Sequence, residues 1–244
     1  MNHPPTPSVG QLESIPVDLY RDIHKAIRVE LFDATTAAGR VDPADHGARH
    51  GHAAKLRDIS RMLAMHAEHE DEVMDQAIRS VLPEQADSIV AEHASLDSEI
   101  TMLVETAELA LTRPAEDRAC AQRLYLDLAA FTSRYLAHQD REERVVMPEL
   151  YRRFGIEPLL EMNERIVSSI APDDMAWSLS MMLPAMNVED RVELLSGMRE
   201  GAPAEVFEGV CGLASQVLGG DDSTALRQRL GLGAPVGVGA GASS

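Results

Sequence analysis

Apolar residues recur three and four positions apart along most of the chain, which is the spacing of amphipathic helices. Few stretches show the alternation of a strand. Because the helical stretches follow one another through short connections, the sequence predicts an all-α protein built on an up-down-up-down four-helix bundle. The four long helices are expected at residues 17–38, at 49–81 or 53–81, at 83–111 or 84–111, and at 115–154.

After Gly155 the amphipathic stretches become shorter and predict four smaller helices within residues 156–232, separated by proline, glycine and asparagine. We expect this segment to pack on the bundle of residues 15–155. The proline-rich residues 1–14 and the glycine-rich residues 233–244 are expected to be a disordered arm and tail, because they offer little apolar surface to bury. Pro148 is expected to kink the last turns of the fourth long helix.

The amino-acid composition excludes several classes of function. The formal net charge of −18 argues against a nucleic-acid backbone or an anionic membrane surface as partner, since both attract clustered positive charge. The sequence contains no apolar run long enough to cross a bilayer and no recognisable signal peptide, so a cytoplasmic protein is expected. The two cysteines are too few for a thiolate metal site.

Histidine is the residue type that composition leaves unexplained, with nine in the chain. Each long helix places one of them within its apolar stripe, and two helices add a glutamate four residues later, on the same face. Burying these groups is costly unless something compensates, and one metal centre would compensate for all of them. The inward-facing residues are His24, His66, Glu70, His93, His138 and Glu142.

The order of these residues is repeated, because a lone histidine precedes a His-x-x-x-Glu pair in each half. Two similar halves, each giving two imidazoles and one carboxylate, suggest two metal ions bridged by the carboxylates. Nitrogen and oxygen ligands without thiolate favour non-haem iron over manganese or zinc. The Glu-x-x-His motif of ferritin-like bundles and the His-Glu-x-x-His motif of zinc proteases are both absent.

The pattern resembles the hemerythrin-like (HHE cation-binding) family over residues 15–154. The resemblance is carried by His24, residues 65–71 (MHAEHED), residues 92–93 (EH) and residues 136–143 (LAHQDREE), with residues 147–150 (MPEL) following. It implies a bundle enclosing two iron ions, oxo- or hydroxo-bridged, that meet O₂, hydrogen peroxide or nitric oxide. It also implies that His24, His66, His93 and His138 are terminal ligands and that Glu70 and Glu142 bridge the irons.

One position departs from the oxygen carriers of that family, which have a further histidine where this chain has Asp97. Asp97, Tyr20, Tyr135 or solvent could complete the coordination, and His69 could be an alternative ligand or lie beside the ligands. An exchangeable coordination position favours reaction over reversible O₂ storage. The expected function is therefore catalase- or peroxidase-like turnover of hydrogen peroxide or reaction with nitric oxide; the alternative is a protein that senses or binds O₂, nitric oxide or iron without turnover.

Overall fold

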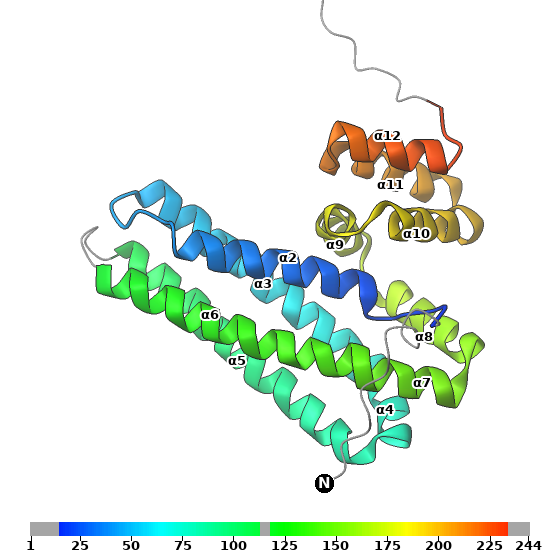
Figure 1. Ribbon diagram of the computed structural model, residues 1–244, viewed down its shortest axis with the longest axis horizontal. Helices are drawn as coiled ribbons and strands as arrows, with labels where there is room; N and C mark the ends of the chain where they lie inside the picture. The colour runs from blue at the N-terminus through cyan, green and yellow to red at the C-terminus, as the bar shows by residue number, and fades with distance from the viewer. Residues whose placement is uncertain (1–14, 113–117, 234–244) are drawn as a thin grey trace, which may run out of the picture. The chain divides into compact units, whose positions relative to one another are not determined.

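The computed structural model describes residues 15–112 and 118–233, which are helical almost throughout (Figure 1). The chain divides into two compact units, the first ending at Ala171 and the second beginning at Pro172. Residues 1–14 and 234–244, where most of the expected disordered arm and tail fall, lie outside the described residues.

The first unit is a four-helix bundle. Each long helix packs against its neighbours in chain order, and the fourth packs back against the first. This arrangement confirms the predicted hemerythrin-type bundle with additional C-terminal helices. The long helices are α2 (Arg21–Ala38), α3 (His46–Val73), α5 (Pro83–Thr112) and α6 (Arg118–Arg141); shorter ones are α4 (Asp75–Val81), η1 (Glu142–Val146), α7 (Met147–Phe154) and α8 (Ile156–Ser169).

Side-chain caps fix where the first two long helices begin. The Asp18 carboxylate accepts hydrogen bonds from the backbone N–H groups of Tyr20 and Arg21, each at 3.0 Å. Asp45 accepts one from the N–H of Ala48 at 2.9 Å. Such bonds satisfy N–H groups that have no partner within the helix, so they stabilise these starting points.

Two irregularities lie close to the inward-facing glutamates. The helix predicted to run to Val81 ends at Val73, and Met74 separates α3 from α4. After α6 the chain makes a π-helical turn, η1, in which the Met147 N–H reaches the Glu142 carbonyl five residues back. Pro148 follows; it lacks an N–H and its ring crowds the preceding turn, so an irregularity was expected here. π-helical turns are frequent at functional sites.

The second unit has a core of its own, formed mainly by leucines of all its helices. Its helices break at the predicted proline, glycine and asparagine positions. Asn187 caps α10 by accepting hydrogen bonds from the N–H groups of Glu189 and Asp190, at 2.8 and 3.0 Å. The segment 156–232 was expected to pack on the bundle. Its first helix, α8, belongs to the first unit. For the rest of the segment, which forms the second unit, packing on the bundle stays a prediction. The helices are α9 (Pro172–Ala185), α10 (Val188–Gly201), α11 (Ala204–Val217) and α12 (Gly220–Arg229).

Replacing the buried Arg191 with alanine is expected to destabilise the second unit by about 2 to 3 kcal/mol. Its guanidinium is buried and donates hydrogen bonds to the Leu183 carbonyl at 2.7 Å and to Asp222 at 2.9 Å. Truncation leaves the carbonyl at the end of α9 without this partner. Urea unfolding of the full chain, followed by hydrogen exchange within residues 172–233, measures the loss. Arg229→Ala, which removes an exposed ion pair with Glu189, is the control and should change stability by less than about 1 kcal/mol.

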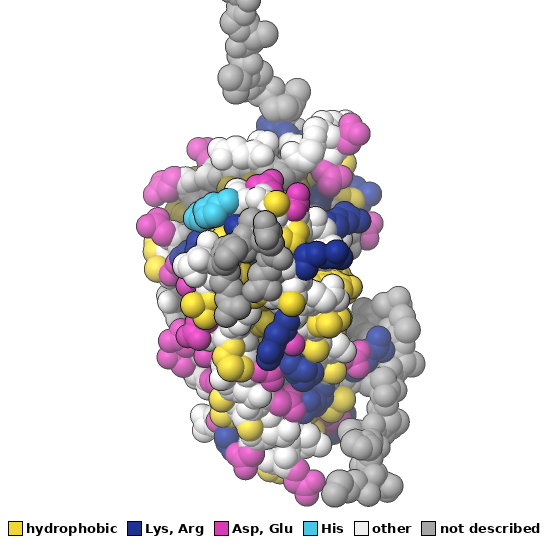
Figure 2. Space-filling model, turned by 90° about the vertical axis from the view of Figure 1, so that its left-hand side faces the viewer, with side chains coloured by type: hydrophobic (Ala, Val, Ile, Leu, Met, Phe, Trp, Pro, Cys, Tyr) yellow, Lys and Arg dark blue, Asp and Glu magenta, His cyan; other side chains and the backbone are white. Residues whose placement is uncertain are grey.

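Acidic, basic and hydrophobic side chains are interspersed on the face shown in Figure 2. Within residues 15–112 and 118–233, no helix combines the length and apolar character needed to span a membrane.

Candidate metal centre

Side chains from all four long helices and η1 meet in the interior of the first unit. They are the six that the sequence singled out: His24 of α2, His66 and Glu70 of α3, His93 of α5, His138 of α6 and Glu142 of η1. Their side chains are at most 7% exposed. Buried apolar residues lie along the same helices on both sides of this cluster, so it occupies a polar layer within an otherwise apolar core.

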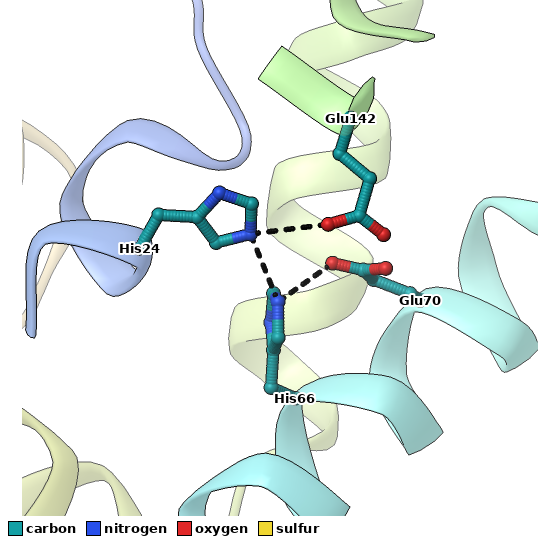
Figure 3. Close-up of side chains that lie close together, drawn as sticks. All are labelled: His24, His66, Glu70 and Glu142. Carbon is teal, nitrogen blue, oxygen red and sulfur yellow. Dashed lines mark hydrogen bonds and ion pairs between the residues drawn. The ribbon is translucent and has the colours of Figure 1, made fainter. Parts of the chain in front are cut away.

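His24, His66, Glu70 and Glu142 form the first group of converging donors (Figure 3). The Nε2 atoms of His24 and His66 lie 3.0 Å apart. The Nε2 of His66 is 2.9 Å from Oε1 of Glu70, and the Nε2 of His24 is 3.5 Å from Oε2 of Glu142. Side chains from three elements therefore point their donor atoms toward one small volume.

His93, His138 and Glu142 form the second group. The Nε2 atoms of both imidazoles face Oε1 of Glu142, at 3.4 Å for His93 and 2.9 Å for His138. The two rings meet nearly edge to face, with centroids 4.8 Å apart. The Nε2 of His93 also lies 3.4 Å from Oε2 of Glu70.

The two carboxylates span both groups. Glu70 presents Oε1 to His66 and Oε2 to His93. Glu142 presents Oε2 to His24 and Oε1 to His93 and His138. Each carboxylate thus has one oxygen toward the His24–His66 pair and the other toward the His93–His138 pair.

Several of these buried atoms lack a hydrogen bond of good geometry, although their charged partners are close. They are both carboxylate oxygens of Glu70, both of Glu142, and the Nε2 atoms of His93 and His138. Buried polar atoms normally have a partner, because leaving them without one costs free energy. A cation would satisfy acceptor atoms that converge in this way, so the residues fit a metal ion.

The electrostatics of the protein without metal agree with this interpretation. Burial alone would lower the pKa of His93, but the carboxylates of Glu142 and Glu70 outweigh it and raise the pKa to about 11. Burial likewise opposes the ionised form of Glu70, yet His66 and His93 hold its pKa well below the usual value. The cluster therefore keeps the Glu70 carboxylate ionised, as a metal ligand must be.

A second layer of carboxylates contacts three of the four imidazoles at Nδ1, on the side of the ring that faces away from the cluster. Glu143 lies 3.0 Å from Nδ1 of His24, Asp71 lies 2.9 Å from Nδ1 of His93, and Glu92 lies 3.1 Å from Nδ1 of His138. A carboxylate at Nδ1 fixes the ring orientation, so that Nε2 is the nitrogen that faces the cluster and can bind metal.

Two of these outer carboxylates are themselves held by arginine. Arg28 donates two hydrogen bonds to Glu143, at 2.7 and 2.9 Å, and Arg141 donates one to Glu92. Burial would raise the pKa of Glu143, but His24 and Arg28 lower it to about 2. Glu143 and Glu92 thus stay ionised and oriented toward their histidines.

Helical periodicity alone does not reveal this layer, because it places Glu92 and Glu143 outside the apolar stripes of their helices. Their long side chains, at the edge of the apolar face, nevertheless reach an imidazole on the neighbouring helix. A signal was present, since each outer carboxylate directly adjoins an inward-facing residue in the sequence. The adjoining pairs are Glu70 with Asp71, Glu92 with His93, and Glu142 with Glu143.

Replacing Glu143 with glutamine is expected to weaken metal binding by about 10- to 100-fold. The amide cannot stabilise the Nδ1 proton of His24 as a carboxylate does, and its pairing with Arg28 is weakened. Competition of the metal against a chelator of known affinity measures the change. Glu72→Gln, on the exposed side of α3, is the matched control and should bind metal as the unaltered protein does.

The remaining sequence candidates lie in different surroundings. Asp97 is exposed on α5 and belongs to neither group, because the turn after His93 directs Leu96 rather than Asp97 into the core. His69 is half-buried, and its Nδ1 contacts the Met65 carbonyl. These positions do not support Asp97 or His69 as ligands.

The two tyrosines, in contrast, are buried beside the cluster. The Tyr20 ring lies 5.1 Å from that of His24, and the Tyr135 ring lies 5.8 Å from that of His138, measured between centroids. The Tyr20 hydroxyl is buried without a hydrogen-bond partner. Burial, followed by the charges of Glu70 and Glu142, raises the Tyr20 pKa well above its usual value. Burial also raises the Tyr135 pKa, so both phenols remain protonated.

Comparison with known families agrees with the fold and the cluster. Residues 15–150 match the model of the hemerythrin HHE cation-binding domain, which covers more than half of the chain. The chain therefore belongs to the hemerythrin HHE cation-binding family and is a metal-binding protein. Searches of curated proteins and of solved structures found no significant match.

Proposed function

We propose that the protein holds a pair of iron ions, bridged by Glu70 and Glu142, and that this pair reacts with hydrogen peroxide or nitric oxide. The observation that carries the proposal is the division of each carboxylate between two histidine pairs. A single ion would need only one group of donors, whereas two groups that share carboxylates suit two ions.

The donor set supports iron as the metal. The first group offers imidazoles and carboxylates only, as does the second. Cys120 lies near the start of α6 and Cys211 lies in the second unit, and neither belongs to the two groups. Imidazole with carboxylate is typical of non-haem iron, and the family's domain is a cation-binding domain.

When bound, two iron ions would supply two-electron redox chemistry together with an exchangeable coordination position. The chain's own residues provide the surroundings. His24, His138 and Glu142 are almost fully buried, which excludes bulk water from their side of the cluster. The protonated Tyr20 hydroxyl has no partner within the described residues, and it can donate a hydrogen bond to a small ligand beside His24.

The test of this function begins with iron content and the absorption spectrum of the aerobically purified protein. The proposal predicts two irons per chain with near-ultraviolet charge-transfer bands, followed by consumption of hydrogen peroxide or nitric oxide. His66→Ala should lose this activity, while the matched variant His69→Ala should retain it. Loaded protein that consumes neither compound would rule out this reactivity.

Sensing without turnover is a second candidate, favoured by the separate compact unit that follows the family domain. In that case ligand binding at the cluster would change the conformational dynamics of residues 172–233. Hydrogen exchange of this unit, compared between metal-free, reduced and oxidised protein, distinguishes the two. Unchanged protection in all three forms would argue against sensing.

A further inference from the structure

A small recess connects the surface of the first unit to the cluster. Its inner end is lined by Glu70 and His93, and its volume is about 10 Å³, space for about one water molecule. The walls come from α4 and the first turns of α5, just beyond the break at Met74. A recess that narrow admits molecules of two or three heavy atoms only when neighbouring side chains shift slightly.

Part of the residual exposure of the cluster lies on the same side, although the side chain of His66, which does not line the recess, is 7% exposed as well. The side chains of His24, His138 and Glu142 are 0, 2 and 1% exposed, whereas those of Glu70 and His93 are each 6% exposed. The two residues that line the recess are therefore among those that solvent still reaches. The α2 and α6 side of the cluster is closed.

The walls of the recess are apolar and its mouth is acidic. Ile78, Ala86, Ile89 and Val90 line the walls. Asp71 and Asp75 line the recess where it meets solvent, with side chains 39 and 29% exposed. Apolar walls suit small neutral molecules, and acidic groups at the mouth disfavour anions.

An exposed ion pair spans the two helices that form the walls. Arg79 of α4 donates hydrogen bonds to Asp75 at 2.7 Å and to Asp87 of α5 at 2.5 Å. It thereby ties α4 to the start of α5 next to Ala86. Because α4 packs against α5, the side chains on the walls set the width.

We propose that this recess is the route by which small neutral molecules such as nitric oxide, O₂ and hydrogen peroxide reach the cluster, with Val90 controlling its width. The proposal rests on the proposed function, since it assumes metal in the cluster. Val90 is half-buried and is not one of the six donors, so its size can be changed without removing a ligand.

The test is the rate of nitric oxide association with the reduced, iron-loaded full chain, followed by stopped-flow absorption. Val90→Trp should slow association by about tenfold or more, and Val90→Ala should accelerate it, with iron content unchanged in both. Val29→Trp, the same change on the exposed side of α2, is the control and should leave the rate unaltered.

The outcomes separate the two proposals. If the unaltered protein binds no iron, the proposed function fails and the route fails with it. If iron is bound but the Val90 variants associate with nitric oxide at the unaltered rate, only the route is overturned. Should Val90→Trp lose its fold, as judged by circular dichroism, Val90→Ala alone decides, because a faster rate supports the route and an unchanged rate contradicts it.

Discussion

The double variant His66→Ala, His138→Ala is expected to lose all bound metal. One imidazole disappears from each group, so neither the His24 side nor the His93 side retains two histidines. Glu70 and Glu142 also lose their nearest imidazoles, which lie 2.9 Å away in both cases. Elemental analysis of protein dialysed against iron(II) and then against buffer measures the loss.

The control for this result is the pair of changes His69→Ala and Asp97→Ala, which removes a histidine from α3 and an acidic residue from α5. Neither residue belongs to a donor group, so this protein should bind as much metal as the unaltered chain. Full metal retention by the His66, His138 double variant would show that the cluster is not the binding site.

Removing the metal is expected to lower the melting temperature of the bundle by roughly 8 to 16 °C. A ligand that binds only the folded state stabilises it by about 4 kcal/mol at a free concentration about 1,000 times the Kd. For a domain of this size each kcal/mol corresponds to about 2 to 4 °C. Thermal unfolding with and without a chelator, followed by circular dichroism, gives the shift.

The double variant is again informative, because its melting temperature should be the same with metal and with chelator. In the double variant His24 still faces Glu142, and His93 still faces both Glu70 and Glu142, so both carboxylates keep an imidazole nearby and the variant is expected to fold. A melting temperature of the unaltered protein that does not respond to metal removal would contradict a buried, folding-linked site.

The six inward-facing residues could be predicted because helical periodicity fixes which positions face the core. His24, His93 and the two His-x-x-x-Glu pairs each interrupt an apolar stripe, and the bundle brings those stripes together. The breaks between the helices of the second unit could also be predicted, because proline and glycine interrupt a helix locally. Whether the six hold metal stays a prediction.

The outer carboxylates could not be placed in the same way, because periodicity describes the direction of the Cα–Cβ bond and not the reach of a long side chain. Glu143 contacts His24 from a different helix, and it does so from a π-helical turn that the sequence signalled only through Pro148. The break at Met74, which precedes the walls of the recess, has no proline or glycine beside it. These features depend on packing between helices rather than on local pattern.

The central claim is a pair of iron ions that share the carboxylates of Glu70 and Glu142. Mössbauer spectroscopy of protein loaded with isotopically enriched iron tests it most directly, because ions joined by bridging ligands couple magnetically and isolated ions do not. The account predicts two irons per oxidised chain with coupled spins and a diamagnetic ground state. A single iron per chain, or two with the magnetic spectra of isolated ferric ions, would contradict it.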